Sequence, residues 1–412
     1  MKNFLVHNDD IKRQMLEDIK LNSVEDLFRQ IPEKARMGTL DLPDAISEME
    51  AQRTVKSLAK KNNTEYISFL GGGVYNKFIP ACISQVANRF EFLTAYTPYQ
   101  PEISQGTLQV MYEFQTMICR LTGMDISNAT MYDGATACAE AILMAVRISK
   151  KNKALVSNKL NPEYIDVIKT YCWASDVEVL FFEDFPENTE DCACVLVQNP
   201  DFYGEIRDYK RPDCLFIVCT DVSSLSILEP PSDADIVVGD IQNLGIPMSF
   251  GGPHAGFIAC REKYLRQIPG RLAGRTVDAD GNPAFCLTIQ TREQHIKREK
   301  ATSNICSNQA LIGLCATLYL TVMGEKGFRQ AGYLSSKNAH NLADKLTQKG
   351  IRVVNKNFYN EFVIEVQNAG KFLSKLKENG ILGGLKLSNK KILVCTTEMN
   401  TEEDIDRYIS SL

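Results

Sequence analysis

The order of apolar and polar positions changes at about residue 60. Residues 1–60 carry scattered apolar residues among many charges and predict a helical N-terminal arm. Ser23 and Asp26 form a capping pair, and Asp41 with Pro43 predicts the start of a helix whose apolar face includes Ile46, Met49 and Leu58. The arm therefore has amphipathic helices but no evident core of its own.

From about residue 66, short apolar runs alternate with helix-length segments. The predicted strands are residues 66–70, 154–157, 177–182, 193–198, 215–220, 236–239 and 256–260, and the predicted helices are residues 104–122, 134–149 and 161–173. Several strands are nearly continuous Val, Ile, Leu and Cys, as is typical of strands covered on both faces. We therefore expect an α/β fold whose large domain, residues 61–306, has a mainly parallel sheet covered by helices on both faces.

The C-terminal part, residues 307–412, predicts a linking helix and a smaller α/β domain. Residues 307–349 read as one long helix with breaks at Gly324 and Gly327. Strands are predicted near residues 352–354, 361–365 and 392–396, and helices near residues 370–379 and 401–411.

The composition argues against several classes of function. The chain has 412 residues, a net charge of -5, 44% hydrophobic and 24% charged residues. The negative charge argues against nucleic acid as a partner, because phosphate binding needs a basic face. No apolar run approaches the ~20 residues that cross a bilayer, and the N-terminus lacks the apolar core of a signal peptide. Thirteen cysteines and four histidines are too dispersed for a metal site, so we expect no metal and a cytoplasmic protein with reduced thiols.

The stretch 94–106 predicts a rigid loop that carries chemistry. Pro98 and Pro101 block a helix and stiffen an extended segment. The polar and aromatic side chains within it are Tyr96, Tyr99, Gln100, Glu102, Ser104 and Gln105. A well-ordered interface loop without catalytic groups remains the alternative.

Two further stretches predict parts of a ligand pocket. Residues 131–140 read as a strand end, a turn at Gly134, Ala135 and Thr136, and a helix whose amides could hold a phosphate. The alternative is that these small residues serve only to let the helix pack tightly on the sheet. Asp221 follows another strand, where it is either a turn former or the partner of a cofactor ring nitrogen.

The charged stretch 291–310 leads into the polar cluster Thr302, Ser303 and Asn304. Its Arg292, His295 and Arg298 lie at near-helical spacing, which would suit an anion or an acidic subunit surface, although a solvated face is the common meaning of such a run. Cys306 is a candidate nucleophile, but no base is evident, and an inert buried thiol is the expected state.

Residues 235–256 resemble the segment that carries the Schiff-base lysine in enzymes that bind pyridoxal phosphate (PLP) on a large parallel sheet, that is, fold type I PLP-dependent transferases. Asn243 takes the place of that lysine here. Because an amide cannot form an imine with an aldehyde, we expect that this chain cannot hold PLP covalently.

Together these stretches resemble the glycine cleavage system P protein, glycine decarboxylase, and in particular its N-terminal half, which some bacteria make as a separate subunit 1. The matching runs are residues 69–73, 94–106, 131–137, 251–254, 269–271 and 298–311. The chain departs from the pattern at residues 282–284, where relatives tend to carry a basic residue and a glycine.

The resemblance implies a heteromer, expected as a two-plus-two heterotetramer. A second subunit of the same fold would hold PLP on its lysine, and the active site would lie at the subunit interface. Glycine would lose its carboxylate there, and the aminomethyl group would pass to the lipoyl group of the H protein.

This chain would complete that site. The residues expected to contribute are Tyr96, Tyr99 and Glu102 as catalytic groups, Gln100 and Ser104 toward glycine, and Thr302, Ser303 and Asn304 toward the PLP of the partner. Gly134, Ala135, Thr136 and Asp221 would form a vestigial pocket with Asn243. Two alternatives stay open: an autonomous PLP enzyme that uses another lysine such as Lys300, and a non-catalytic scaffold or glycine-sensing pseudoenzyme.

Overall fold

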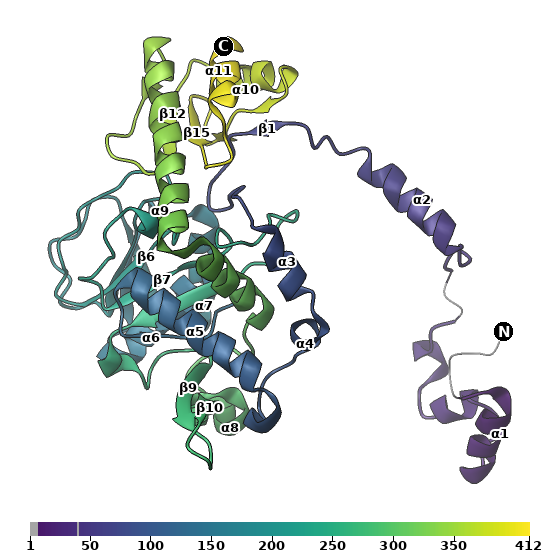
Figure 1. The fold of residues 1–412 in the computed structure, drawn as a ribbon. Coiled ribbons are helices and arrows are strands. Elements are labelled where there is room, and N and C mark those ends of the chain that lie inside the picture. The colour runs from purple at the N-terminus through teal and green to yellow at the C-terminus, as the bar shows by residue number, and fades with distance from the viewer. Residues whose placement is uncertain (1–6, 39–40) are drawn as a thin grey trace. The chain divides into compact units, whose positions relative to one another are not determined.

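The computed structural model describes residues 7–38 and 41–412, which fall into two compact units. The first unit ends at Thr64 and the second spans Glu65–Leu412 (Figure 1). The second unit contains every predicted strand.

A seven-stranded sheet forms the centre of the second unit, in the order β2-β8-β7-β6-β5-β3-β4. The strands are β2 Ile126–Ser127, β3 Lys153–Ser157, β4 Glu178–Phe182, β5 Cys194–Gln198, β6 Leu215–Cys219, β7 Ile236–Asp240 and β8 Gly256–Cys260. Strands β7, β6, β5, β3 and β4 are parallel to one another, whereas β8 is antiparallel to both β7 and β2. The predicted α/β class and mainly parallel sheet are confirmed.

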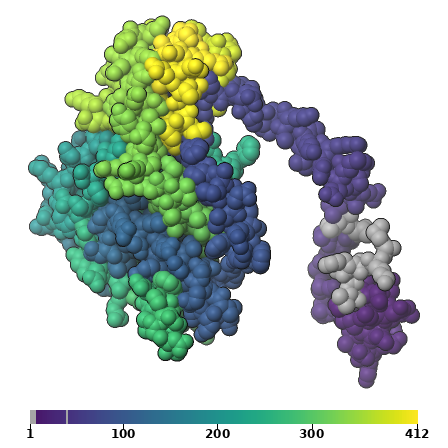
Figure 2. Space-filling model, viewed as in Figure 1, coloured from purple at the N-terminus to yellow at the C-terminus, as the bar shows by residue number. Residues whose placement is uncertain are grey.

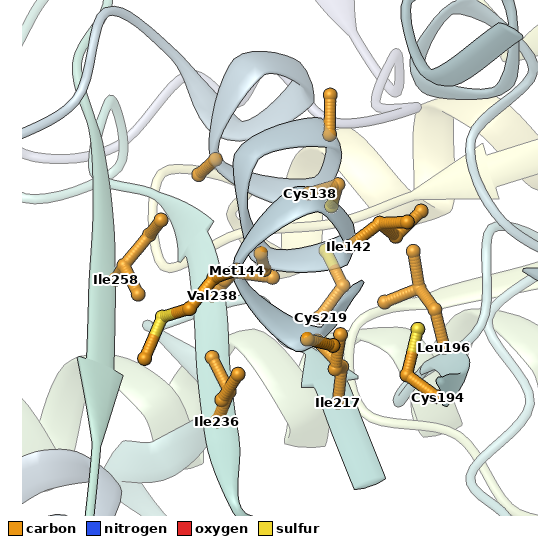
Figure 3. Close-up of a cluster of buried hydrophobic side chains, with 14 of the residues drawn as sticks. Cys138, Ile142, Met144, Cys194, Leu196, Ile217, Cys219, Ile236, Val238 and Ile258 are labelled. Atoms are coloured by element: carbon orange, nitrogen blue, oxygen red, sulfur yellow. The ribbon is translucent and has the colours of Figure 1, made fainter. Parts of the chain in front are cut away.

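Helices cover both faces of this sheet because successive strand residues point to opposite sides. On one face, α6 (Gly134–Ser149) and α7 (Pro162–Ala174) pack over side chains such as Leu196 and Val238 (Figure 3). On the other face, α5 (Gln105–Thr122) packs with the start of α9 over alternate residues such as Val195 and Val237. Strands such as β5 and β7 thus contribute side chains to two separate cores, which explains why they are apolar at nearly every position.

The long helix α9, Ala310–Gln348, connects the large and the small domain (Figure 1). Gly324, with φ 58° and ψ -177°, interrupts it as the sequence predicts, whereas the predicted break at Gly327 is not formed. By length and composition α9 could cross a membrane, contrary to the sequence expectation. Its two halves bury residues in two different cores, through Tyr319 before the kink and Leu342 after it, which is typical of a core helix.

The small domain has a four-stranded sheet in the order β11-β12-β15-β14. Its elements are β11 Arg352–Val353, β12 Glu361–Glu365, β14 Leu385–Lys386, β15 Lys391–Cys395, α10 Ala369–Glu378 and α11 Glu402–Ser410. The C-terminal segment, yellow in the space-filling view, packs on the second half of α9 (Figure 2). All strand pairs in this sheet are antiparallel.

Two strand assignments differ from the sequence prediction. Residues 66–70 do not join the large sheet, since β1 (Ile67–Ser68) pairs with β13 (Ile381–Leu382), and Phe69 is buried in the core of the small domain. The sequence also missed the hairpin of β9 (Leu272–Val277) and β10 (Pro283–Thr288), which forms a sheet of its own. The remaining helices of this unit are α3 Ala81–Ala87, α4 Phe90–Leu93 and α8 Gln294–Lys297.

The first unit contains α1 (Asp9–Asp18) and α2 (Glu48–Ala59), and no residue of either fully described helix is buried. The Ser23–Asp26 capping pair is confirmed, since each side chain accepts a hydrogen bond from the backbone N–H of the other residue. The predicted helix start at Asp41 and Pro43 is wrong, because Ser47 caps α2 in a reciprocal capping box with Glu50.

Lys77 ties the N-terminal part of the second unit to the small domain. Its side chain is 4% exposed, and its Nζ lies 3.3 Å from the Glu398 carboxylate and 3.1 Å from the Ser335 hydroxyl. The backbone N–H of Phe78 donates to the same carboxylate at 2.9 Å. A buried ion pair with these additional hydrogen bonds becomes costly when one partner is removed, because the other charge stays buried.

We expect Lys77→Met to lower the free energy of unfolding by about 3–5 kcal/mol, the range for breaking a buried ion pair. Lys169→Met is the matched control, since the exposed Lys169–Asp166 pair should contribute at most about 1 kcal/mol. Urea denaturation of both variants measures the difference. Equal losses would contradict the assignment of Lys77 as a buried anchor.

Candidate active site

Asp221 and Asn243 meet at the carboxyl ends of β6 and β7, where parallel sheets commonly bind ligands. The amide nitrogen of Asn243 donates directly to the Asp221 carboxylate. The hydroxyl of Ser223 also donates to that carboxylate, at 2.9 Å. Asn243 is 5% exposed, and its amide oxygen has no hydrogen-bond partner within residues 7–38 and 41–412.

The surroundings of Asp221 shift its pKa in opposite directions. Burial raises its pKa above the ordinary value, while the charge of Lys77 and the hydrogen bonds from Ser223 and Asn243 act in the opposite direction. Asp221 is thus a turn former through the N–H of Ser223 and the acceptor for Asn243 at the same time. The geometry shows the turn-former role of Asp221, and the Asn243 amide occupies the carboxylate that a cofactor ring nitrogen would need.

The turn at Gly134, Ala135 and Thr136 opens α6, as the sequence predicts. Asp133 caps the helix, and its carboxylate accepts a hydrogen bond from the backbone N–H of Thr136 at 2.7 Å. The N–H of Gly134 donates to a second carboxylate, that of Asp240, at 3.1 Å. Protein carboxylates therefore already take two of the amides that a phosphate would use.

A cavity of about 620 Å³ lies beside this helix end. Its lining includes Asp133, Asp240, Glu163, Tyr164 and His254. The Nδ1 atom of His254 lies 3.2 Å from the Asp240 carboxylate, and that hydrogen bond raises the pKa of His254. Within the described part of the chain, neither Asp221 nor Asn243 lines the cavity.

These residues do not fit PLP. The position of the expected Schiff-base lysine holds an amide, the side chains of Asn243 and Asp221 are in direct contact, and carboxylates cover the helix amides that would bind the phosphate. A dianionic phosphate beside two carboxylates would be repelled, because like charges in partly buried sites interact by several kcal/mol. The pocket of this chain thus has the architecture of a cofactor site without its chemistry.

The loop 94–106 presents its candidate side chains outward. Tyr96 is 82% exposed and Tyr99 is 47% exposed, while Gln100 and Glu102 are exposed and Ser104 is half-buried. Gln105 anchors the loop to β10, because its amide nitrogen donates to the carbonyl of Phe285 and its amide oxygen accepts from the N–H of Phe285, both at 2.9 Å. The loop is therefore fixed in place while most of its functional groups stay accessible.

Arg271 joins this loop to the segment 302–308. Its guanidinium donates to the Tyr99 hydroxyl at 3.0 Å and to the carbonyl of Cys306 at 2.9 Å. It also donates to the side chains of Ser307 and Asn308, each at 3.2 Å. The Arg271 side chain is only 3% exposed. One buried cation thus places two sequence-distant segments on the same face of the large domain.

Three hydrogen bonds donated by its backbone N–H groups fix the segment 302–306 to the large domain. The N–H of Thr302 donates to the carbonyl of Arg292, that of Asn304 to the Glu140 carboxylate, and that of Cys306 to the Tyr132 hydroxyl. Thr302 and Ser303 are half-buried and Asn304 is exposed. The structure brings this segment close to Tyr99 through Arg271, and it places Asp221 and Asn243 in a separate cluster.

Two expectations for the charged stretch are wrong. Arg292, His295 and Arg298 do not form one anion-binding face, because Arg292 is buried and donates to the backbone carbonyls of Ile268, Gly270 and Ile289. Cys306 is exposed and not buried. Among residues 7–38 and 41–412, no group of three or more His, Cys, Asp or Glu side chains could hold a metal ion.

Sequence reasoning gave no role to Arg271, Asp240, Tyr164 or His254. Arg271 and His254 belong to the Gly-rich runs 269–271 and 251–254. A charged residue beside Gly and Pro in an apolar region is a usable signal for a buried functional group. Asp240 and Tyr164 carry no local signal, because their contacts come from other elements.

Comparison with known proteins gives consistent results. The family model described as "Glycine cleavage system P-protein" matches residues 2–412. A Geobacillus thermodenitrificans protein named probable glycine dehydrogenase (decarboxylating) subunit 1 is 42% identical over 442 aligned positions, covering 99% of this chain and 98% of the relative. A Solibacter usitatus protein of the same name is 44% identical, covering 99% and 96%.

Solved structures agree with the sequence relatives. The crystal structure of a glycine decarboxylase (P-protein) of the glycine cleavage system, in an inhibitor-bound form, matches with a TM-score of 0.91 and 38% identity over 100% of both chains. A sphingosine-1-phosphate lyase from Burkholderia pseudomallei matches with a TM-score of 0.64 at 12% identity, covering 92% of this chain and 93% of the lyase, which shows the fold alone. The predicted fold type I PLP-transferase architecture is confirmed.

Proposed function

The chain belongs to the glycine cleavage system P-protein family, and from this premise we propose that it is subunit 1 of a two-subunit glycine dehydrogenase (decarboxylating). A second subunit would carry PLP on its lysine. Together the subunits would decarboxylate glycine and transfer the aminomethyl group to the lipoyl group of the H protein.

The observation that carries this proposal is the contrast between the two sites of the chain. The cofactor-like pocket has Asn243 bonded to Asp221 and does not fit PLP. The loop 94–106 and the segment 302–308 are instead ordered around Arg271 and present accessible groups on the surface. Groups that are fixed in place but lack a cofactor of their own suit a site that a partner completes.

Tyr99 has the most defined geometry in this site. Its oxygen accepts a hydrogen bond from Arg271, so its own O–H remains available as a donor. A donor held beside a guanidinium is suited to orient a carboxylate such as that of glycine. The PLP of the partner would supply the electron sink for decarboxylation.

The other loop residues have narrower proposed roles. Exposed Tyr96 would contact the partner's site, and exposed Glu102 would orient the glycine amine or transfer a proton. Gln100 and Ser104 would contact glycine, and Thr302, Ser303 and Asn304 would face the partner's cofactor.

We propose a cytoplasmic two-plus-two heterotetramer without nucleic-acid or membrane partners. All thirteen cysteines are free thiols, which suits a reducing compartment. The autonomous alternative that uses Lys300 finds no geometric support, since Lys300 is exposed at the end of the short helical turn Arg298–Lys300. The scaffold or glycine-sensing alternative predicts that the loop 94–106 is dispensable for turnover.

We expect Tyr99→Phe to lower turnover of the assembled enzyme by about tenfold or more, because it removes the hydroxyl that Arg271 positions. Assembly and PLP content should stay normal. Tyr333→Phe is the matched control, since Tyr333 is an exposed tyrosine on α9. Weaker assembly with normal turnover per complex would show that Tyr99 only packs at an interface.

A second expectation concerns the arm. Helix α1 has 10 residues and no buried side chain, and isolated helices shorter than ~12–15 residues are marginal in water. The exposed apolar residues of the segment 7–38, which include Met15, Leu27 and Phe28, would be stabilised by a partner. Interfaces of permanent heteromers commonly bury on the order of 2,000 Å² or more.

Deletion of residues 1–40 should therefore weaken assembly with the second subunit and leave the unfolding temperature of the isolated chain nearly unchanged. Sedimentation of the mixed subunits and thermal unfolding of the chain alone measure the two effects. As a control, replacing Leu27 and Phe28 by Ser should weaken assembly in the same direction without shortening the chain. Unchanged assembly after the deletion would contradict the role given to the arm.

A further inference from the structure

Asp240 occupies the place where an anionic ligand would meet α6. It is the last residue of β7 and lies three positions before Asn243. Its carboxylate accepts a hydrogen bond from the N–H of Gly134 at 3.1 Å. Both of its oxygens also lie 3.2 Å from Nδ1 of His254. A helix N-terminus beside an imidazole attracts an anion, and here the anion is a side chain of the chain itself.

The space directly next to Gly134, on the wall of the cavity, is also occupied. A Cβ atom added to Gly134 would lie 2.4 Å from the Tyr164 hydroxyl and 3.1 Å from Cβ of Asp240. Burial raises the pKa of Tyr164 well above its ordinary value, and the Asp240 charge adds to that effect. A neutral phenol and a carboxylate therefore stand where phosphate oxygens would need room.

The groups that would hold the cofactor ring are also bonded within the chain. In a PLP enzyme of this fold the cofactor ring lies between the lysine and the aspartate that holds the ring nitrogen. In this chain Asn243 donates to Asp221 directly, and Ser223 satisfies the same carboxylate. Burial raises the pKa of Asp221, and the positive charge of Lys77 and the hydrogen bonds from Ser223 and Asn243 oppose that rise.

We propose that side chains of this chain stand in for both ends of the cofactor: the Asp240 carboxylate takes the place of the phosphate on α6, and the Asn243 amide takes the place of the ring N–H on Asp221. The groups that would hold the two ends of the cofactor are then satisfied without a ligand. Restoring a lysine at position 243 alone leaves PLP binding weak, because Asp240 still occupies the Gly134 amide. This inference concerns the isolated chain and goes beyond the proposed decarboxylase function, so it stands or falls without any activity measurement.

The test compares three full-length variants: Asn243→Lys, the double variant Asn243→Lys with Asp240→Ser, and the double variant Asn243→Lys with Glu163→Gln. Glu163 lines the same cavity and its replacement changes the charge equally, but it is exposed and makes no contact with the amides of α6 in the described residues. Each variant is titrated with PLP, reduced with borohydride and mapped by peptide mass for pyridoxyl-lysine at position 243.

We expect the Asp240→Ser double variant to bind PLP about tenfold or more tightly than the single variant, a difference of ~1.4 kcal/mol. The Glu163→Gln double variant should resemble the single variant. Stoichiometric labelling of the single Asn243→Lys variant would overturn the proposal. Equal gains in PLP affinity from Asp240→Ser and Glu163→Gln would overturn it as well. The loss of one negative charge anywhere in the cavity would then explain the tighter binding.

A second measurement uses inorganic phosphate and needs no lysine. Asp240→Ser alone should gain thermal stability with phosphate at constant ionic strength, whereas the unaltered chain and Glu163→Gln should not. Asp240→Asn, which keeps the size of the side chain, replaces Asp240→Ser if the serine variant unfolds. A folded Asp240 variant that gains neither phosphate nor PLP binding would show that Asp240 is not the stand-in for phosphate.

Discussion

The hydrogen bond between the Asn243 amide and the Asp221 carboxylate is the constraint on which the rest of this structure depends. It joins the ends of two neighbouring parallel strands, where the fold would otherwise place a ligand. A reactive lysine at this position would need a free amine near a cofactor aldehyde, whereas an amide bonded to a carboxylate is chemically inert. The sheet and its helices keep the architecture of a cofactor enzyme, and the chemistry of the pocket is internal hydrogen bonding.

Because the cofactor-binding groups of the inner pocket bond to one another, the groups available to a partner lie elsewhere. Arg271 is buried and shares its donors between Tyr99 and the segment 306–308. Such a cation fixes its neighbours more rigidly than a lysine could, since the planar guanidinium donates in several fixed directions. The chain thus contains a pocket whose polar groups bond to one another. It also contains a surface whose hydroxyl and carboxylate groups remain available to a partner.

The sequence predicted the large sheet well, since strands such as β5 and β6 are continuous apolar runs covered on both faces. It misplaced residues 66–70, because an apolar pattern indicates a strand but not which sheet it joins. Loop 94–106 and Asn243 were visible as local patterns. The Arg271–Tyr99 bond spans 172 positions and the Gly134–Asp240 bond spans 106 positions, so neither contact can be predicted from a local sequence pattern.

The central claim is that PLP is held by the second subunit while this chain completes the site from outside. The direct measurement is borohydride reduction of the assembled two-subunit enzyme in the presence of PLP, followed by peptide mapping of both chains. We predict one pyridoxyl-lysine per pair of subunits, located in the second subunit alone. A stoichiometric pyridoxyl-lysine in this chain, at Lys300 or any other lysine, would contradict the account.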